Sequence, residues 1–268
     1  MKKISVLIGL MLVLAVAVSP ASALIGGELD TEHTNVGAYV FYWPEYNDTF
    51  RACSGTLIHP RVLLTAAHCI VMLENGGIAF NQVRVTFDQN ALAEGPTYLD
   101  IDKIIAHPDF DYSRPDSHDI ALVILAEPVV GIDPEPLPPL GYMDKVIQQT
   151  LHGKSQRVLD LIVVGYGASD ISLPVPDVHL DAIRRVGTVT FKDLTPFEIK
   201  TFQYRNPENA AVYFGDSGGP LFHVDKHGNE VLVGLLACVG GGCSDSGVNY
   251  RVDTASARDF IEANLPQD

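Results

Sequence analysis

The sequence has few cysteines, a single tryptophan and a shortage of basic residues. Its 268 residues include 18 Lys and Arg against 33 Asp and Glu, which gives a formal net charge of −15. A surface of this sign repels nucleic acid and anionic membranes, so we expect neither as a partner. A content of 47% hydrophobic residues, with 23 glycines and 17 prolines, indicates a globular protein rich in turns and excludes a disordered one.

Long hydrophobic runs are also absent, except for one at the start of the chain. Lys2 and Lys3 precede an apolar run over residues 4–18, and small residues with an A-x-A ending close it at Ala23. This pattern predicts a secretory signal peptide, residues 1–23, and a secreted mature protein. An uncleaved membrane anchor is the alternative, but the run is short for a spanning helix of about 20 residues.

In a secreted chain, the four cysteines allow two disulfides in three pairings. Cys53 and Cys69 are 16 positions apart, and Cys238 and Cys243 are 5 apart in a Gly-rich segment. Sequential pairing is the simplest choice. A zinc site is the alternative, although no C-x-x-C or suitable Cys/His spacing supports it. We expect no metal and no cofactor.

Most of the chain has the pattern of short strands separated by Gly, Pro, Asn and Asp, which predicts an all-β fold. The proline-rich stretch 128–139 is interpreted as a linker that divides the mature chain into two β domains, 24–135 and 136–268. The segments expected as strands are Ala38–Tyr42, Thr56–Ile58, Val62–Thr65, Val83–Phe87, Ile101–Ala106, Ile120–Leu125, Val158–Val164, Arg185–Phe191, Gly219–His223, Val231–Ala237 and Val248–Val252.

Helical signal is scarce, and its best example is the C-terminal tail. Thr254 is a suitable cap for a short helix over Ala255–Asn264, apolar residues recur there at helical spacing, and Pro266 ends the pattern.

Three short motifs carry the chemistry. Leu-Thr-Ala-Ala-His-Cys places His68, Asp-Ile-Ala-Leu begins at Asp119, and Gly-Asp-Ser-Gly-Gly-Pro places Ser217. A serine hydroxyl is a poor nucleophile at neutral pH, so it needs a base within hydrogen-bond reach and donors aimed at the developing oxyanion. The glycines around Ser217 let the backbone turn sharply and direct the N–H groups of Gly215 and Ser217 toward one point.

The third motif also fits G-x-S-x-G, the nucleophile turn of α/β-hydrolases. That fold needs a helix directly after the serine, with an Asp and then a His downstream. Pro220 blocks such a helix, and only 51 residues follow Ser217. An α/β-hydrolase is therefore disfavoured.

The three motifs, in the order His, Asp, Ser, resemble those of the chymotrypsin (trypsin-like) family of serine peptidases, and the resemblance covers nearly all of the mature chain. It implies two antiparallel β-barrels with the active site in the cleft between them and a short C-terminal helix. It further implies a serine endopeptidase that acts through an acyl-enzyme. The segment 165–167, Gly-Tyr-Gly, resembles a loop of that family that normally has Trp at its centre.

The resemblance implies a role for each motif residue. Ser217 is the expected nucleophile, His68 the general base, and Asp119 the group that orients His68. The amides of Gly215 and Ser217 form the expected oxyanion hole. A disulfide between Cys53 and the cysteine after His68 is implied as well.

The family also uses a new N-terminal ammonium, which inserts beside the Asp that precedes the nucleophile. Here the expected pair is Leu24 and Asp216. Because Leu24 directly follows the predicted cleavage after Ala23, we expect signal peptidase alone to create the activating amine.

The specificity pocket departs from that of trypsin itself. Ala211 takes the position at its base where an acid would be needed to bind Arg or Lys, and Val239 and Gly247 are expected on its walls. These residues predict a preference for small or medium apolar side chains.

Two further positions differ from the family pattern. Tyr213 replaces a Cys that usually pairs with the later loop, which leaves Cys238–Cys243 as an unusual short-loop disulfide or as two free thiols. Ala237 stands where a Ser is common. Glu74 and Asn75 lie in a loop that binds calcium in some members, but an acidic surface alone explains them.

Two other functions compete with a peptidase. One is a catalytically silent, peptidase-like binding protein, and the other is a secreted esterase. For the peptidase, the expected partner is a protein or peptide substrate, and the expected state is a monomer without membrane association after signal cleavage.

Overall fold

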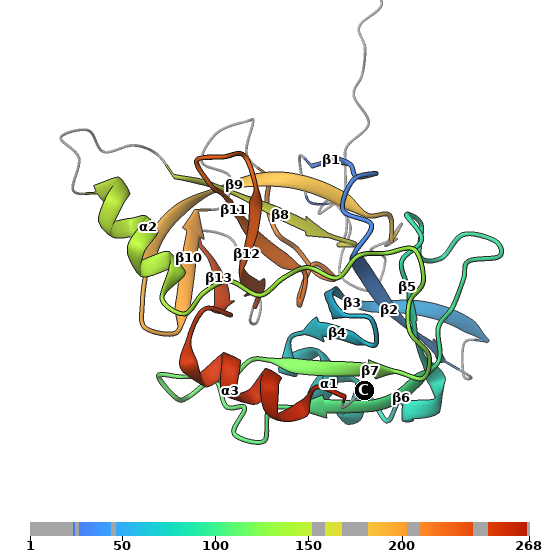
Figure 1. Cartoon of the computed structure of the whole chain (residues 1–268). Coiled ribbons are helices and arrows are strands. Elements are labelled where there is room, and N and C mark those ends of the chain that lie inside the picture. Colours follow the sequence, from blue (N-terminus) through green and yellow to red (C-terminus); the bar gives the residue numbers. More distant parts are fainter. Residues whose placement is uncertain are drawn as a thin grey trace, which may run out of the picture.

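The computed structural model describes residues 24, 27–43, 47–151, 159–167, 182–202, 210–237 and 246–266 (Figure 1). The expected signal peptide, Val239 and the pair Cys238 and Cys243 lie outside these residues. Every segment expected as a strand overlaps a strand of the structure. The fold is all-β, as predicted.

The first sheet has six antiparallel strands in the order β5-β2-β3-β4-β7-β6. Its inner strands β4 and β7 have the sequences Val-Leu-Leu-Thr and Ala-Leu-Val-Ile-Leu, and all their residues are buried. A bridge between Val85 and Leu99 brings the two edges of this curled sheet toward each other. The strands are β2 Val36–Trp43, β3 Asp48–His59, β4 Val62–Thr65, β5 Val83–Thr86, β6 Ile101–Ala106 and β7 Ala121–Leu125.

The second sheet has seven antiparallel strands in the order β1-β9-β10-β13-β12-β11-β8. Since β8 also pairs with β9, six of them close into a barrel, and β1 adds an edge strand from the other end of the chain. The strands are β1 Glu28–Leu29, β8 Asp160–Gly165, β9 Arg185–Leu194, β10 Glu198–Phe202, β11 Pro220–Val224, β12 Glu230–Leu236 and β13 Ser246–Arg251.

The C-terminal helix α3, Ala255–Asn264, begins and ends where the sequence predicts. The Thr254 side chain accepts a hydrogen bond from the Ala257 amide, which confirms the predicted cap. Phe260 packs its ring against His107, just beyond β6, so this last helix crosses back onto the first sheet (Figure 1).

Two further helices were not predicted. The sequence pattern indicates a chain poor in helix, but α1 spans Ala67–Asn75 and α2 spans Tyr142–Leu151, and a 3₁₀ turn covers Phe80–Gln82. The described part of the chain has no helix of sufficient length and apolar character to traverse a bilayer.

A shared hydrophobic core holds the two sheets together. One cluster joins Val40, Leu64 and Leu122 of the first sheet to Phe222 and Leu232 of the second. One further cluster fills the inside of the first half, and another fills the inside of the second half. The junction between the sheets is therefore a packed interface, and residues from both halves meet across it at fixed positions.

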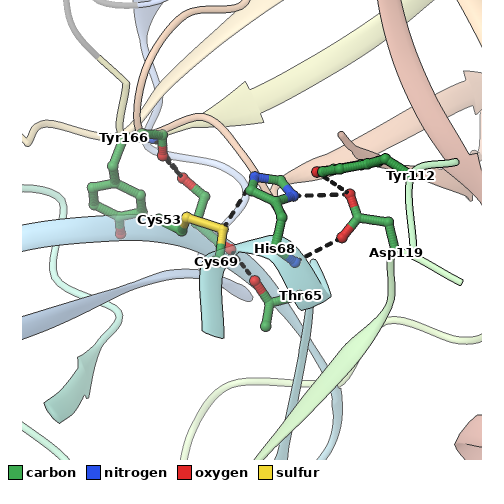
Figure 2. The surroundings of a disulfide bond; sticks show 9 residues. Cys53, Thr65, His68, Cys69, Tyr112, Asp119 and Tyr166 are labelled. Atoms are coloured by element: carbon green, nitrogen blue, oxygen red, sulfur yellow. Dashed lines mark hydrogen bonds and ion pairs between the residues drawn. A yellow bond between two sulfur atoms is a disulfide. The ribbon is translucent and has the colours of Figure 1, made fainter. Parts of the chain in front are cut away.

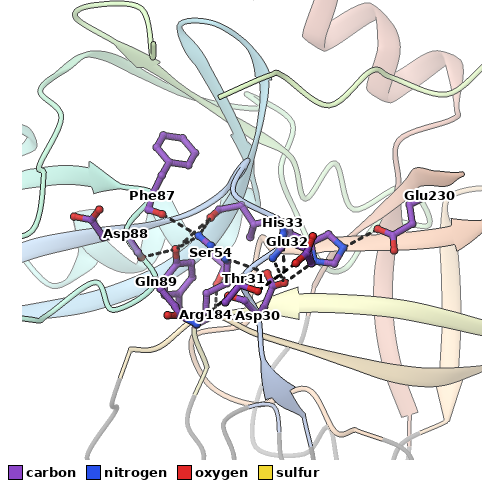
Figure 3. A network of polar contacts seen from close by, with 12 residues as sticks. Asp30, Thr31, Glu32, His33, Ser54, Phe87, Asp88, Gln89, Arg184 and Glu230 are labelled. Carbon is purple, nitrogen blue, oxygen red and sulfur yellow. Dashed lines mark hydrogen bonds and ion pairs between the residues drawn. The ribbon is translucent and has the colours of Figure 1, made fainter. Parts of the chain in front are cut away.

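A buried polar network anchors the chain around β1 (Figure 3). The Arg184 guanidinium donates to Asp30 at 3.1 Å, to the backbone carbonyls of Val36 and Phe87, and to the Tyr166 hydroxyl at 3.0 Å. His33 extends the network, with Nδ1 2.9 Å from Asp30 Oδ1 and Nε2 2.7 Å from Glu230 Oε2. Both halves of the fold and the N-terminal segment thus share one set of hydrogen bonds.

Candidate active site

His68 lies in the first turn of α1, where backbone N–H groups have no partner within the helix. Asp119, two residues before β7, supplies that partner: its Oδ1 accepts from the His68 backbone N–H at 2.8 Å. Its other oxygen, Oδ2, lies 2.8 Å from His68 Nδ1 (Figure 2). One buried carboxylate therefore caps the helix and holds the imidazole ring at the same time.

This double contact fixes the tautomer of His68. A carboxylate facing Nδ1 accepts a hydrogen bond from it, so Nδ1 carries the hydrogen and Nε2 keeps its lone pair. The imidazole is partly exposed, whereas the Asp119 side chain is fully buried. Such a histidine can take a proton at Nε2 while the buried carboxylate compensates the charge that forms on the ring.

A disulfide between Cys53 on β3 and Cys69 on α1 flanks the histidine (Figure 2). The Cα atoms are 6.4 Å apart, within the usual range for a bonded pair. Sequential pairing is confirmed for these two cysteines, and a zinc site on them is excluded because both sulfurs are bonded to each other. The disulfide ties α1, and with it His68, to the first sheet.

The loop that carries Ser217 turns on glycines in left-handed conformations, with φ of +94° at Gly215 and +77° at Gly218. At Gly218 no other residue fits, because a Cβ would collide with the Thr65 hydroxyl and lie 2.5 Å from the Ser54 carbonyl oxygen. The loop is thus pressed against the residues that lead directly into α1. In the described part of the chain no hydrogen bond joins the Ser217 hydroxyl to His68.

Ser54 on β3 holds this loop from the opposite sheet. Its amide donates to the Ser217 carbonyl oxygen at 2.8 Å, and its hydroxyl donates to the Gly215 carbonyl oxygen at 2.8 Å. The same hydroxyl accepts from the Tyr166 amide at 3.0 Å. Ser54 was not predicted as a site residue, because a small polar residue in a strand gives no signal of a contact made far along the chain.

Asp216 is fully buried directly before Ser217. Its carboxylate accepts hydrogen bonds from the Gly167 amide at 2.7 Å and the Tyr213 amide at 2.9 Å. A Cβ at Gly165 or Gly167 would run into this carboxylate, which explains the two glycines of the Gly-Tyr-Gly segment. Asp216 therefore joins two loops next to Ser217, the expected nucleophile.

The remaining predicted site residues are only partly described. Leu24 is fully buried in the core of the second half, with Met143 and Leu161 in the same cluster. Ala211 is buried, and Gly247 lies on β13 opposite Thr201 of β10. Val239 is outside the described residues.

Tyr112 is a second site residue that was not predicted. It lies between β6 and β7, and its hydroxyl donates to Asp119 Oδ2 at 3.1 Å (Figure 2). The connection over residues 107–118 shows no periodic pattern, so the sequence gives no sign that this side chain returns to the carboxylate.

Comparisons with known proteins agree with the motifs. A family model described as Trypsin matches residues 38–261. A tryptase of Mus musculus is 37% identical over 235 residues, which cover 83% of this chain and 82% of that protein.

Two insect proteins are also similar. Phenoloxidase-activating factor 1 of Holotrichia diomphalia is 28% identical over 238 residues, and CLIP domain-containing serine protease B4 of Anopheles gambiae is 27% identical over 242 residues. Each alignment covers 80% of this chain, but the chain spans only 62% of the length of either insect protein.

Proposed function

Because this chain belongs to the trypsin family of serine endopeptidases, we propose that it cleaves peptide bonds through an acyl-enzyme on Ser217, with His68 as the base and Asp119 as the group that orients it. The observation that carries the proposal is the double contact of His68 with buried Asp119, which leaves the lone pair of Nε2 to accept a proton.

In the first half of the reaction, Ser217 Oγ bonds to the scissile carbonyl carbon and its proton passes to His68 Nε2. The carbonyl oxygen becomes an oxyanion, and the amides of Gly215 and Ser217 donate to it. The C–N bond then breaks, and His68 returns the proton to the leaving amine. In the second half, a water molecule bonds to the acyl carbon and gives a proton to His68 Nε2. The bond from that carbon to Ser217 Oγ then breaks, His68 returns the proton to Ser217, and the carboxylic acid is released. Asp119 keeps its own charge throughout and stabilises the imidazolium.

We also propose that the mature protein is secreted and begins at Leu24, whose amine pairs with Asp216. Burial of both residues supports this pairing. N-terminal sequencing of the secreted protein tests it, and any first residue other than Leu24 refutes it.

For the substrate, we propose small or medium apolar residues before the cleaved bond, because buried Ala211 offers no charge to a basic side chain. A panel of peptides that differ only at that residue decides the point. A clear preference for Arg or Lys contradicts it.

The central test compares the mature protein with its Ser217→Ala variant, using Ser113→Ala as a control at an exposed serine. We expect Ser217→Ala to lower kcat by about a million-fold, the magnitude known for nucleophile removal in serine peptidases, and to abolish labelling by a fluorophosphonate. Ser113→Ala should retain both. A folded wild type that neither cleaves nor is labelled would instead be a binding protein, and ester cleavage without peptide cleavage would indicate an esterase.

A further inference from the structure

The Tyr112 hydroxyl donates to Asp119 Oδ2 at 3.1 Å, and this is the same oxygen that lies 2.8 Å from His68 Nδ1 (Figure 2). The carboxylate therefore receives three hydrogen bonds. The His68 backbone amide binds Oδ1, while the His68 ring and Tyr112 share Oδ2.

Packing fixes the direction of this hydroxyl. The Tyr112 ring lies edge-on to Phe110, with centroids 4.9 Å apart, and tilted against the His68 ring at 6.2 Å. Partial burial is the main cause that raises the pKa of Tyr112 well above its usual range, and the nearby negative charge of Asp119 raises it further. The phenol thus stays protonated and acts only as a donor toward the carboxylate.

A carboxylate that is fully buried depends on such donors. Hydrogen bonds to ionised groups are roughly twice as strong as neutral ones, and each fixes the plane of the carboxylate as well as stabilising its charge. With only the two contacts from His68, Asp119 would be oriented by the very residue that it must orient. The Tyr112 hydroxyl orients the carboxylate from a different part of the chain, independently of His68.

We propose that Tyr112 is a positioning residue for the catalytic carboxylate, which sets the direction of Asp119 Oδ2 and thereby aims His68 Nε2 at the nucleophile. This inference rests on the proposed peptidase function. It assigns Tyr112 no contact with substrate.

Tyr112→Phe tests the proposal, because it removes the hydroxyl and keeps the ring packed on Phe110 and His68. We expect kcat to fall about three- to thirtyfold with KM within about twofold, since a charge-assisted bond is lost while binding is untouched. Tyr98→Phe is the matched control: Tyr98 is 38% exposed against 41% for Tyr112, and its hydroxyl bonds to the Ala91 carbonyl oxygen away from the site.

A second measurement is independent of turnover. The far-downfield proton resonance of His68 Nδ1–H reports its bond to Asp119, and it should move in Tyr112→Phe because the competing donor on Oδ2 is gone. It should not move in Tyr98→Phe. Unchanged kcat and an unchanged resonance in an active enzyme overturn the proposal. A fall in kcat with an unchanged resonance also overturns it and assigns Tyr112 to packing alone.

The peptidase function and the positioning role of Tyr112 are refuted by different results. If the wild type cleaves no peptide, the proposed function fails, while the resonance still shows whether Tyr112 shapes the His68–Asp119 bond.

Discussion

The hydroxyl of Ser54 donates a 2.8 Å hydrogen bond to the carbonyl oxygen of Gly215, 161 positions away and in the other half of the fold. Gly215 is the residue whose amide we assign to the oxyanion hole. The peptide next to that amide is therefore held by a side chain from the half of the molecule that carries His68. Because of this contact, the shape of the loop that carries Ser217 depends on the junction between the sheets.

We predict that Ser54→Ala lowers both stability and activity. It leaves the Gly215 carbonyl and the Tyr166 amide without their partner at a fully buried position, which costs about 1–3 kcal/mol in the free energy of unfolding. We expect kcat to fall about tenfold, because the oxyanion donors lose their fixed geometry. Urea unfolding and steady-state kinetics measure the two effects.

Thr56→Val is the control for this substitution. Thr56 lies two residues further along β3, is equally buried, and has a hydroxyl with no hydrogen-bond partner among the described residues. Its removal should leave kcat unchanged and stability equal or higher. If both variants lose activity alike, the Ser54 contact has no special role.

Gly218→Ala should damage the fold more than the same change at Gly228. Both glycines have positive φ, +77° and +85°, so each alanine incurs the cost of left-handed backbone, about 1–2 kcal/mol. At Gly228 no atom of the described chain lies within 4 Å of the new methyl group, whereas at Gly218 it meets Thr65 and Ser54. We expect a further cost of about 1–3 kcal/mol there, measured by urea unfolding. Equal losses would show that the site is not tightly packed at Gly218.

Arg184→Met should destabilise the protein strongly. The Arg184 side chain is 3% exposed and that of Asp30 is 2%, so the variant leaves a buried carboxylate without its guanidinium. Removal of one partner of a buried ion pair typically costs about 3–5 kcal/mol. Arg114→Met, at a pair with Asp109 in which both side chains are more than half exposed, should cost less than about 1 kcal/mol. Similar losses in the two variants would contradict the importance of burial here.

His33 should make stability depend on pH. Burial alone lowers the pKa of His33, but its hydrogen bonds and charge interactions with Asp30 and then Glu230 outweigh burial and raise the pKa above its usual value. A raised folded pKa means that the stabilisation is fully present below the usual histidine pKa, about 6.5, and is lost as pH rises through the folded pKa.

The matching experiment is urea unfolding of the wild type and His33→Gln between about pH 5.5 and about pH 8.5. The advantage of the wild type should be largest at the acidic end and shrink as pH rises. Burial raises the pKa of Asp30, but the contacts with His33 and the hydrogen bonds from neighbouring amides outweigh burial and lower it. Asp30 therefore stays ionised across this window. His227→Gln, at an exposed histidine, is the control; an advantage that does not vary with pH would refute the prediction.

The features that could be predicted from the sequence are those set by neighbouring residues. Val62–Thr65 and Ile101–Ala106 are strands with the predicted ends, because apolar runs between turn residues determine them locally. The helix Ala255–Asn264 followed from its Thr254 cap and its spacing. The Asp30–Arg184 pair and the Ser54–Gly215 contact could not be predicted from the sequence, since each joins residues more than 150 positions apart.

The two helices that were not predicted have different causes. In α1, residues 67–75, the catalytic motif around His68 shows only weak apolar periodicity. In α2, residues 142–151, the helix begins shortly after the proline-rich stretch that was interpreted as a linker. Tertiary packing decides the conformation of α1. In α2, Tyr142, Met143, Val146 and Ile147 recur at helical spacing and face the core, so the local signal was present and the linker interpretation overrode it.

The position of β1 affects how the chain can fold as it is synthesised. Glu28 is among the first residues of the expected mature chain, yet it pairs with Val186 on β9, and the neighbouring Asp30 bonds to a residue 154 positions later. Such high contact order delays the final assembly until most of the chain has been made. A nascent chain that carries only the first sheet has His68 and Asp119 but lacks Ser217, the proposed nucleophile. Peptidase activity thus arises late, after β1 near the start of the mature chain has paired with β9.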